Sequence, residues 1–223
     1  MRYSSISAED LLQDLSRRIR VLDLKPGSMI SENEMAEYYN VSRSTIRTIF
    51  SKLEQMKLVT RLPQIGTFIS PFNLELINQI MYIRYLIELD AFEKLIDKGL
   101  SEELIHKLEN NIKEQEKNID IQEYENTFQK IDDDFHKLIL NSVGLGTLME
   151  VLSDHSIHLQ RWRNFEVTAC SKINLIVNQH KEIFQTLLDR DFPACKKIVT
   201  THLMSIQKTE FIEEMKLKYP EYF

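Results

Sequence analysis

The 223-residue chain is poor in the residues that interrupt helices, with only five glycines and five prolines. Long stretches are instead rich in Leu, Ile, Glu, Lys and Gln, which favour helix. The two cysteines, Cys170 and Cys195, lack the spacing of a disulfide framework, so we expect reduced thiols. No apolar run approaches the ~20 residues of a membrane span, and no signal peptide is recognisable. These absences predict a mainly α, soluble cytoplasmic protein with few strands.

Charge is distributed unevenly along the chain, whose formal net charge is −6. Residues 1–70 carry 10 Lys and Arg against 8 Asp and Glu, whereas residues 71–223 carry 18 against 26. Phosphate binding depends on the local basic surface rather than on the total charge. The acidic total therefore does not exclude a nucleic-acid partner for the N-terminal part.

The first 70 residues show the pattern of a winged helix-turn-helix. Apolar residues recur with helical period, and capping residues divide them into three helices followed by two short β-type runs. The expected elements are helices 9–22, 31–39 and 42–57, then strands 58–61 and 67–70 around a turn that contains Gly66. Ser42 is the expected N-cap of the third helix, on which Arg43 and Arg47 share one face.

Pro71 ends this pattern, and Asn73 can cap the helix that follows. We therefore predict domains at residues 1–70 and 71–223. Turn signals divide the second domain into six helices that form an antiparallel bundle. Their predicted ranges are 73–98, 101–119, 122–142, 146–166, 170–189 and 192–218.

Several separated motifs in the first domain resemble the DNA-binding domain of GntR-family bacterial transcription regulators. They are Leu24–Glu32, Met35-Ala36, Val41–Arg47, Leu53, Lys57–Val59 and Gly66–Ile69. The resemblance implies that Arg43 and Arg47 contact operator DNA, with Gly66 at the minor groove. Ser42 and Ser44 lie near the positive end of the helix, where they suit phosphate. An arginine on a recognition helix suits guanine, which offers two acceptors to its guanidinium. The chain departs from many members at Ser44–Ile49, so the operator sequence is not transferable.

An acid and three histidines in the second domain have spacings that suit one metal ion. Asp132 and His136 lie one turn apart on a helix. His180 and His202 lie ten and eleven residues from the turn at Arg190-Asp191, so two antiparallel helices place them at one height, about 16 Å from the turn. Three imidazoles and a carboxylate suit a divalent transition metal: Zn first, with Ni, Mn, Fe or Co as alternatives.

Residues 73–215 resemble the FCD effector-binding domain of the FadR-like branch, in its six-helix, vanillate-repressor-like variety. The matching residues are Arg84, Glu88, Asp132–His136, His180 and His202. The resemblance implies that Asp132 and the histidines hold the metal, with Asp133 as rival, and that a small organic acid completes its coordination. Arg84 is the first candidate for binding this acid and Arg161 the second, with Arg163 on a neighbouring face. It also implies a homodimer on an inverted-repeat operator.

Two other functions compete with a ligand-controlled, non-enzymatic regulator. An all-α metalloenzyme of the di-iron type needs two Glu-x-x-His pairs, and the sequence contains only Glu103–His106. It also leaves residues 1–70 unexplained. Alternatively, the metal is purely structural and no effector exists. His106, His155 and His158 lack a spacing relation to the other three histidines, so we expect them at the surface or behind the ligands.

Overall fold

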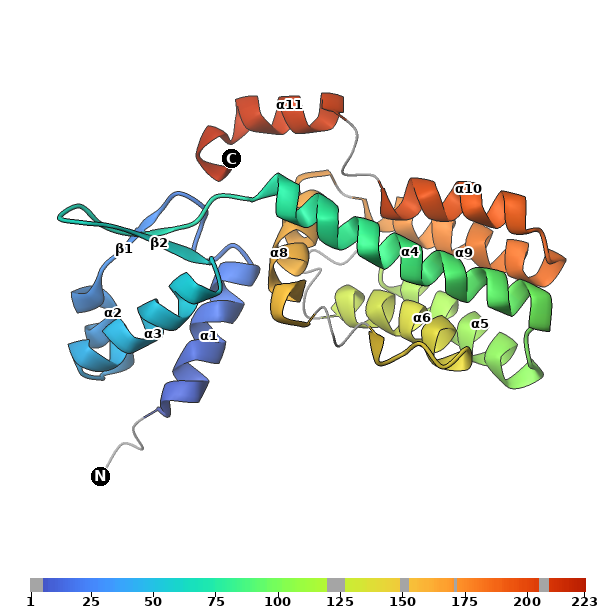
Figure 1. The fold of residues 1–223 in the computed structure, drawn as a ribbon, viewed down its shortest axis with the longest axis horizontal. Helices are drawn as coiled ribbons and strands as arrows, with labels where there is room; N and C mark the ends of the chain where they lie inside the picture. The colour runs from blue at the N-terminus through green and yellow to red at the C-terminus, as the bar shows by residue number, and fades with distance from the viewer. Residues whose placement is uncertain (1–5, 120–126, 149–152, 171, 205–208) are drawn as a thin grey trace.

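The computed structural model describes residues 6–119, 127–148, 153–170, 172–204 and 209–223. A small N-terminal head lies at one end and an elongated helical domain at the other, with a steep helix, α8, between them (Figure 1). No described helix is long and apolar enough to cross a membrane. The predicted fold class, a winged helix-turn-helix followed by a helical domain, is confirmed.

Three helices and a three-stranded antiparallel sheet form the head. The helices are α1 (Ala8–Arg20), α2 (Glu32–Tyr39) and α3 (Arg43–Gln55), and the strands are β1 (Met29–Ile30), β2 (Val59–Leu62) and β3 (Gly66–Ile69). The strand order is β1-β3-β2, and Leu62 opposite Gly66 closes the wing hairpin. Apolar residues from α1, α3 and the sheet bury one another in a single core. The sequence missed β1, which has only two residues.

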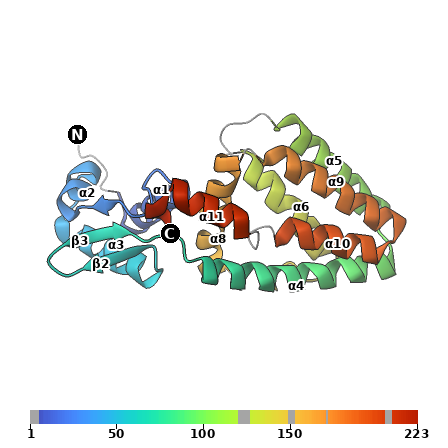
Figure 2. The ribbon, with the colours of Figure 1, turned by 90° about the horizontal axis from the view of Figure 1, so that it is seen from above.

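The helical domain begins at α4 and packs along it. Its helices are α4 (Leu74–Lys98), α5 (Glu102–Lys117), α6 (Gln129–Ser142), α8 (Ser153–Cys170), α9 (Ile173–Asp189), α10 (Phe192–Leu203) and α11 (Thr209–Lys218), followed by a 3-10 turn, η3 (Pro220–Tyr222). Helices α9 and α10 form an antiparallel pair against α4, and α5 pairs with α6 (Figure 2). Ile69 belongs to the head core and Phe72 to the core of the helical domain, so residues 1–70 and 71–223 remain the proposed domains.

Short polar side chains start the helices where the sequence predicts. Ser42 Oγ accepts from the backbone N–H of Thr45 at 3.1 Å, and Asn73 Oδ1 accepts from that of Leu76 at 2.9 Å. These bonds satisfy N–H groups that the first turn of a helix leaves unpaired. Ser31 is the N-cap of α2, and its Oγ accepts from the backbone N–H of Asn33 at 3.2 Å.

The predicted helix 192–218 is wrong, since it is two helices. Helix α10 ends at Leu203 and α11 begins at Thr209, so the described residues from 74 to 218 contain seven helices rather than six. Apolar residues keep their helical period across the break, and no Gly or Pro marks it. The resemblance to the FCD domain does not depend on this count, but the choice of its six-helix variety did, and seven described helices do not support that choice. The first turns of predicted helices 122–142 and 146–166 lie outside the described residues.

The C-terminus folds back onto the linker between the two domains. The backbone N–H of Phe72 donates to the carbonyl of Tyr222 at 2.7 Å. Phe72 also lies within 5.2–6.0 Å, centroid to centroid, of Trp162, Phe165, Tyr222 and Phe223. Rings at this spacing add to the stabilisation that their burial provides. The aromatic cluster therefore fixes where α4 leaves the head.

Candidate metal centre and nucleic-acid interface

Three helices bring three histidines to one point inside the helical domain. His136 comes from α6, His180 from α9 and His202 from α10, and all are buried. Each offers a ring nitrogen within 4.8 Å of those of the other two. Nε2 of His202 lies 3.2 Å from Nε2 of His180 and 3.3 Å from Nε2 of His136. Asp132, one turn before His136, places Oδ1 3.6 Å from Nε2 of His180.

Each of these rings has an oxygen partner on its outer nitrogen. Nδ1 of His136 lies 2.6 Å from Glu88 Oε2, and Nδ1 of His180 lies 2.8 Å from Gln115 Oε1. Nδ1 of His202 lies 2.9 Å from Gln179 Oε1. A neutral imidazole that donates Nδ1–H to such an acceptor keeps a lone pair on Nε2. The three lone pairs therefore point at one another.

Burial disfavours the imidazolium form of His180 and His202. It lowers the pKa of His180 to about 3 and holds the pKa of His202 well below its usual value. Burial opposes the ionisation of Asp132, yet Arg163 and the other cationic neighbours keep its pKa below the ordinary value. His180 and His202 are thus neutral and Asp132 is a carboxylate at neutral pH, the forms that bind metal.

The donor set fits one transition-metal ion. Two nitrogens that are each ~2.1 Å from one ion in tetrahedral or octahedral geometry lie about 3.0–3.4 Å apart, which the two Nε2 distances match. Every donor is nitrogen or oxygen, so the set suits Zn, Ni, Co, Fe or Mn and does not choose among them. The mirrored spacing of His180 and His202 about the turn at Arg190 does bring both rings together.

Two arginine–carboxylate pairs flank the imidazoles. Arg84 donates through Nε to Glu88 Oε1 at 2.5 Å, and Glu88 in turn holds His136. Arg163 donates through Nη2 to Asp132 Oδ2 at 3.1 Å. The charges of these four buried side chains balance. The sequence ranked Arg161 above Arg163 as an acid-binding residue, but Arg163 is the arginine of α8 that reaches Asp132.

Arg161 faces the head instead of the histidines. Its Nη2 donates to the carbonyl of Ser70 at 2.5 Å, and its guanidinium lies 4.9 Å from the centre of the Phe72 ring. Its expected role in binding an acid together with the three histidines is corrected, because side chains two residues apart on a helix point to different sides. His158 is not a surface residue either, since it is buried with Nε2 2.9 Å from the Met56 carbonyl.

The other residues considered from the sequence lie away from the three rings or give no contact with them. Asp133 is only partly buried, which favours Asp132. His106 is exposed on α5, where Glu103 pairs with Lys107. The side chain of His155 and that of Cys170 lie outside the described residues, and Cys195 is a buried free thiol. Periodicity gave no signal for Gln115 or Gln179, because an amide that supports a ligand from another helix has no fixed spacing.

Helix α3 presents the residues expected at DNA on the surface of the head. Ser42, Arg43, Ser44 and Arg47 are all exposed, and the Oγ atoms of Ser42 and Ser44 lie 2.7 Å apart. Arg47 contacts Glu32 through Nε at 3.2 Å and Nη2 at 2.9 Å, while Arg43 lies 3.9 Å from the same carboxylate. Glu32, which the sequence did not single out, therefore gathers both arginines at the start of α2.

The wing projects beside this helix. Gly66 begins β3 with a φ of +155°, and a Cβ there would lie 3.1 Å from Met29 Sδ, so a side chain would press on β1. Arg61 on β2 donates to the Arg47 carbonyl at 3.1 Å and to Ser51 Oγ at 2.7 Å, and pairs with Glu54 at 3.4 Å. It ties the wing to α3, a role that no sequence pattern indicated. Ile65 at the tip is exposed.

Comparison with known protein families gives two matches. Residues 7–69 match the bacterial regulatory proteins of the gntR family, and residues 79–205 match the FCD domain. The second match covers more than half of the chain. The segment beyond it, which contains α11 and η3, is the part that packs on the linker.

Curated relatives and solved structures agree with these matches. The HTH-type transcriptional repressor RspR of Escherichia coli is 26% identical over 90% of this chain and 86% of its own length. The uncharacterized HTH-type regulator YdhC of Bacillus subtilis is 30% identical over 80% of this chain and 79% of its own. A putative GntR regulator from Rhodococcus sp. RHA1 superposes with a TM-score of 0.66 at 16% identity, over 95% and 97% of the two chains.

Proposed function

We propose that a small organic acid, bound at a divalent metal ion, controls the affinity of this chain for operator DNA. The premise is that the chain belongs to the GntR family of bacterial regulatory proteins and carries an FCD domain. The chain is a transcription regulator of this type. The metal, the acid, the homodimer and the inverted-repeat operator are the proposal. The single observation that carries it is the convergence of three Nε2 lone pairs beside the Asp132 carboxylate.

The metal would be held by Asp132, His136, His180 and His202. Three unprotonated ring nitrogens that face one another repel unless a cation or a proton lies between them, and burial disfavours the proton. The hydrogen bonds that the rings donate to Glu88, Gln115 and Gln179 orient them in advance. A bound divalent metal would supply a Lewis-acidic position with room for further oxygen donors.

Charge balance supports an acid as the effector. Arg84 and Arg163 already offset Glu88 and Asp132, so a divalent cation would leave two positive charges unbalanced inside the domain. An unbalanced buried charge is costly, and an anionic ligand relieves this cost. Arg163 and Arg84 are the residues that we propose for its carboxylate groups. Zn is the metal that we expect first, as for other sites with this donor set.

Helix α8 is the proposed route from the ligand to the head. Arg163 on this helix contacts Asp132. Side chains on the other faces of α8 bind backbone carbonyl groups of the head. Arg161 binds the Ser70 carbonyl, Asn164 the Arg20 carbonyl at 3.1 Å, and His158 the Met56 carbonyl. A ligand that draws Arg163 away from Asp132 would shift α8, and the head would move with it. The two states bind DNA differently if their head positions differ.

The experiment that tests this proposal measures operator affinity with and without metal and acid. Operator DNA is first selected from a random pool, and its dissociation constant is then measured in Zn²⁺ across a panel of mono-, di- and tricarboxylates. We expect one acid class to change the constant by about 5- to 150-fold, a typical allosteric coupling. Arg163→Gln should lose most of that change while it keeps its metal, because it breaks the contact between α8 and Asp132.

Lys137→Gln is the matched control, since it removes a cation from the exposed face of α6 beside His136. It should respond to the acid as the wild type does. An undiminished response in Arg163→Gln would contradict the route through α8. If no carboxylate changed operator affinity, while chelation unfolded the protein, the metal would be structural and the effector part of the proposal would be lost.

Removing the oxygen that faces Nδ1 of one histidine should weaken metal binding without removing a metal ligand. Gln179→Ala deletes the oxygen that Nδ1 of His202 faces. Supporting hydrogen bonds of this kind are worth about 10- to 100-fold in metal affinity. We expect Zn²⁺ affinity, measured by competition with a chelating dye, to fall within that range. Gln185→Ala, on the exposed face of the same helix, should leave it unchanged, and equal affinities for both variants would contradict the proposed support.

A further inference from the structure

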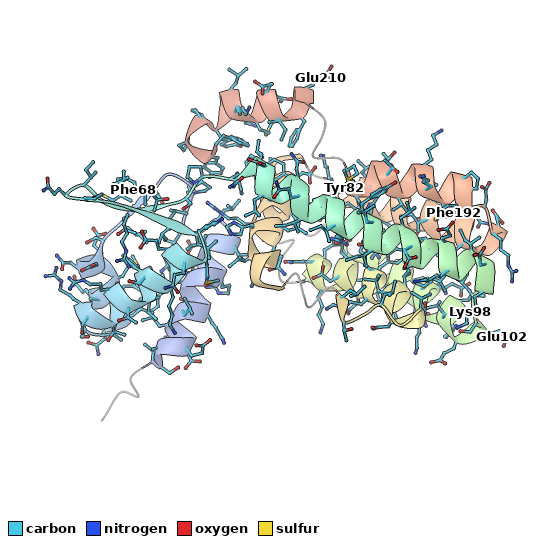
Figure 3. The ribbon with its side chains drawn as sticks, in the orientation of Figure 1. Phe68, Tyr82, Lys98, Glu102, Phe192 and Glu210 are labelled. Atoms are coloured by element: carbon cyan, nitrogen blue, oxygen red, sulfur yellow. The ribbon has the colours of Figure 1, made fainter. Side chains whose placement is uncertain are left out.

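Residues 209–223, which form α11 and η3, leave the antiparallel bundle and return to the head. Helix α11 lies over α8, apart from α9 and α10, and η3 lies where α4 begins (Figure 1, Figure 2). Glu210 marks the exposed outer side of α11 (Figure 3). The segment follows the part of the chain that matches the FCD domain, which ends at residue 205. We call residues 209–223 the strap.

The strap contacts the head itself at Gly27, in the loop before β1. A Cβ at Gly27 would lie 2.7 Å from the carbonyl oxygen of Glu221 and 3.1 Å from its Cβ, so the two backbones touch. Gly27 also has a φ of +75°, which glycine adopts without strain. Its N–H donates to the carbonyl of Ile69 at 2.9 Å, so the loop is tied to the last strand of the head. The head therefore rests on the turn of η3.

The next residue of the strap holds the linker. The carbonyl of Tyr222 accepts the N–H of Phe72 at 2.7 Å, and the buried Tyr222 ring lies beside those of Phe72 and Phe165. Glu221 and Tyr222 thus contact the head and the linker from adjacent positions. Because the strap contacts the chain on both sides of Pro71, the head cannot rotate about the linker unless one of these contacts breaks.

Apolar side chains hold the strap on α8. The ring centroids of Phe211 and Phe223 each lie 6.3 Å from that of Trp162, which is buried. Met215 faces inward from α11 and is 3% exposed, whereas Leu217 faces water and is 86% exposed. The strap is therefore held by burial of one face of its helix, which removes apolar surface from water.

The strap also packs over polar groups that would gain from contact with water. Trp162 Nε1 and Arg161 Nε are buried and have no hydrogen-bond partner among the described residues. Burial lowers the pKa of Arg161 to about 10, so its charge is held there at a cost. Unpaired buried donors and a buried charge both cost free energy. Apolar contacts that are opposed in this way favour a strap that opens while the helical domain stays folded.

We propose that the strap is a positioning element of the DNA-binding head. When it is closed, it fixes the direction in which the head leaves the helical domain. When it is open, the head stays attached through the linker and α8 alone. The strap packs on the helix that carries Arg163, so a shift of α8 also disturbs the strap. Only the consequence for two heads on one operator rests on the proposed function.

Trp162 is the only tryptophan of the chain, so its fluorescence reports whether the strap is closed in the intact protein. In the wild type we expect blue-shifted emission that acrylamide quenches little, because this side chain is 1% exposed. Met215→Asp places a charge beneath the strap and should shift the emission to the red and raise the quenching constant several-fold. Leu217→Asp is the matched control, since it adds the same charge on the exposed face of α11, and it should change neither quantity.

Nuclear magnetic relaxation of the backbone amides then tests whether the strap fixes the head. In the wild type, the head and the helical domain should tumble with one correlation time. In Met215→Asp, and in Tyr222→Ala, which removes a buried ring without adding charge, the head should tumble faster than the helical domain. Three outcomes would overturn the proposal: a head that stays rigid while Trp162 is exposed, a Trp162 that stays protected in both variants, or a helical domain that unfolds with the strap. This measurement uses no DNA, metal or acid, so it decides the matter even if the proposed function fails.

Operator spacing measures the consequence for DNA binding. One inserted base pair moves a half-site by about 3.4 Å and rotates it by about 35°. The wild type should lose about 10-fold or more in affinity on such an insertion, because a rigid protein must then twist the DNA. Met215→Asp should lose less than about 3-fold, because its heads can turn to follow the half-site, so less twisting of the DNA is needed. Leu217→Asp should behave as the wild type does. A wild type that bound only single half-sites would remove the two-headed operator and leave the relaxation result to decide the role of the strap.

Discussion

His180→Ala should purify without stoichiometric metal, whereas the wild type should carry about one divalent ion per chain. The substitution removes the ring whose Nε2 lies 3.2 Å from Nε2 of His202 and 3.6 Å from Oδ1 of Asp132. Of the three rings it is the most deeply buried, and it stacks on Phe135 with centroids 4.1 Å apart. A ligand that binds only the folded state at 1,000 times its dissociation constant stabilises it by ~4 kcal/mol. Metal-loaded wild type should therefore melt roughly 10 °C above its chelated form.

The measurement is metal analysis together with melting curves in the presence and absence of chelator. His180→Ala should show no dependence of its melting temperature on added Zn²⁺. His202→Ala and Asp132→Ala should behave alike, though Asp132→Ala also leaves Arg163 without its carboxylate. His106→Ala, at an exposed histidine on α5, should retain the metal. A wild type that binds no divalent metal, or a His180→Ala protein that binds it fully, would end the metal proposal.

Arg43→Ala and Arg47→Ala should each abolish selection of a defined operator. A bidentate contact between an arginine and guanine is worth about 1–3 kcal/mol of discrimination, and a homodimer makes each contact twice. The expected loss of discrimination free energy is thus about 2–6 kcal/mol per operator. The preference for one base should relax at the base pair that the arginine reads. Binding to unrelated DNA should fall much less. Affinities are compared at fixed salt, because phosphate contacts depend strongly on it.

Lys52→Ala provides the control for charge alone. Lys52 lies on α3 like the two arginines, but it is exposed in the last turn rather than the first. Its removal should weaken binding to all sequences by a similar small factor and leave the selected motif intact. If Arg47→Ala gave the same uniform effect, Arg47 would be a phosphate contact and base reading would rest elsewhere. In the free protein Arg47 forms an ion pair with Glu32. When DNA binds, Arg47 must therefore either contact Glu32 and the DNA together or give up the ion pair.

The N-terminal head could be predicted from sequence in detail because its signals are local. Ser42 caps α3, Ile46, Ile49, Phe50 and Leu53 form its buried stripe, and the Gly66 turn joins β2 to β3. Each of these features depends on residues that are near one another in the chain. The convergence of His180 and His202 could be predicted for a similar reason, because one tight turn joins their two helices.

Other features could not be predicted because they depend on which helix faces which. Arg161 and Arg163 have similar surroundings in the sequence, yet one holds the Ser70 carbonyl and the other Asp132. Gln115 reaches His180 from a helix 65 residues away. The break after Leu203 was missed for the same reason, because the apolar residues of α11 find partners at the linker rather than along α10.

The sequence by itself determined that a helix-turn-helix head precedes a helical domain, and which acid and histidines are spaced to meet. Periodicity and capping act over a few residues and are written in the order of the chain. Only the tertiary structure decided that α8 holds the head and Asp132 at once, and that residues 209–223 return to the linker and the head. Those outcomes depend on the rotation and packing of whole helices, which are fixed by contacts between residues far apart in sequence.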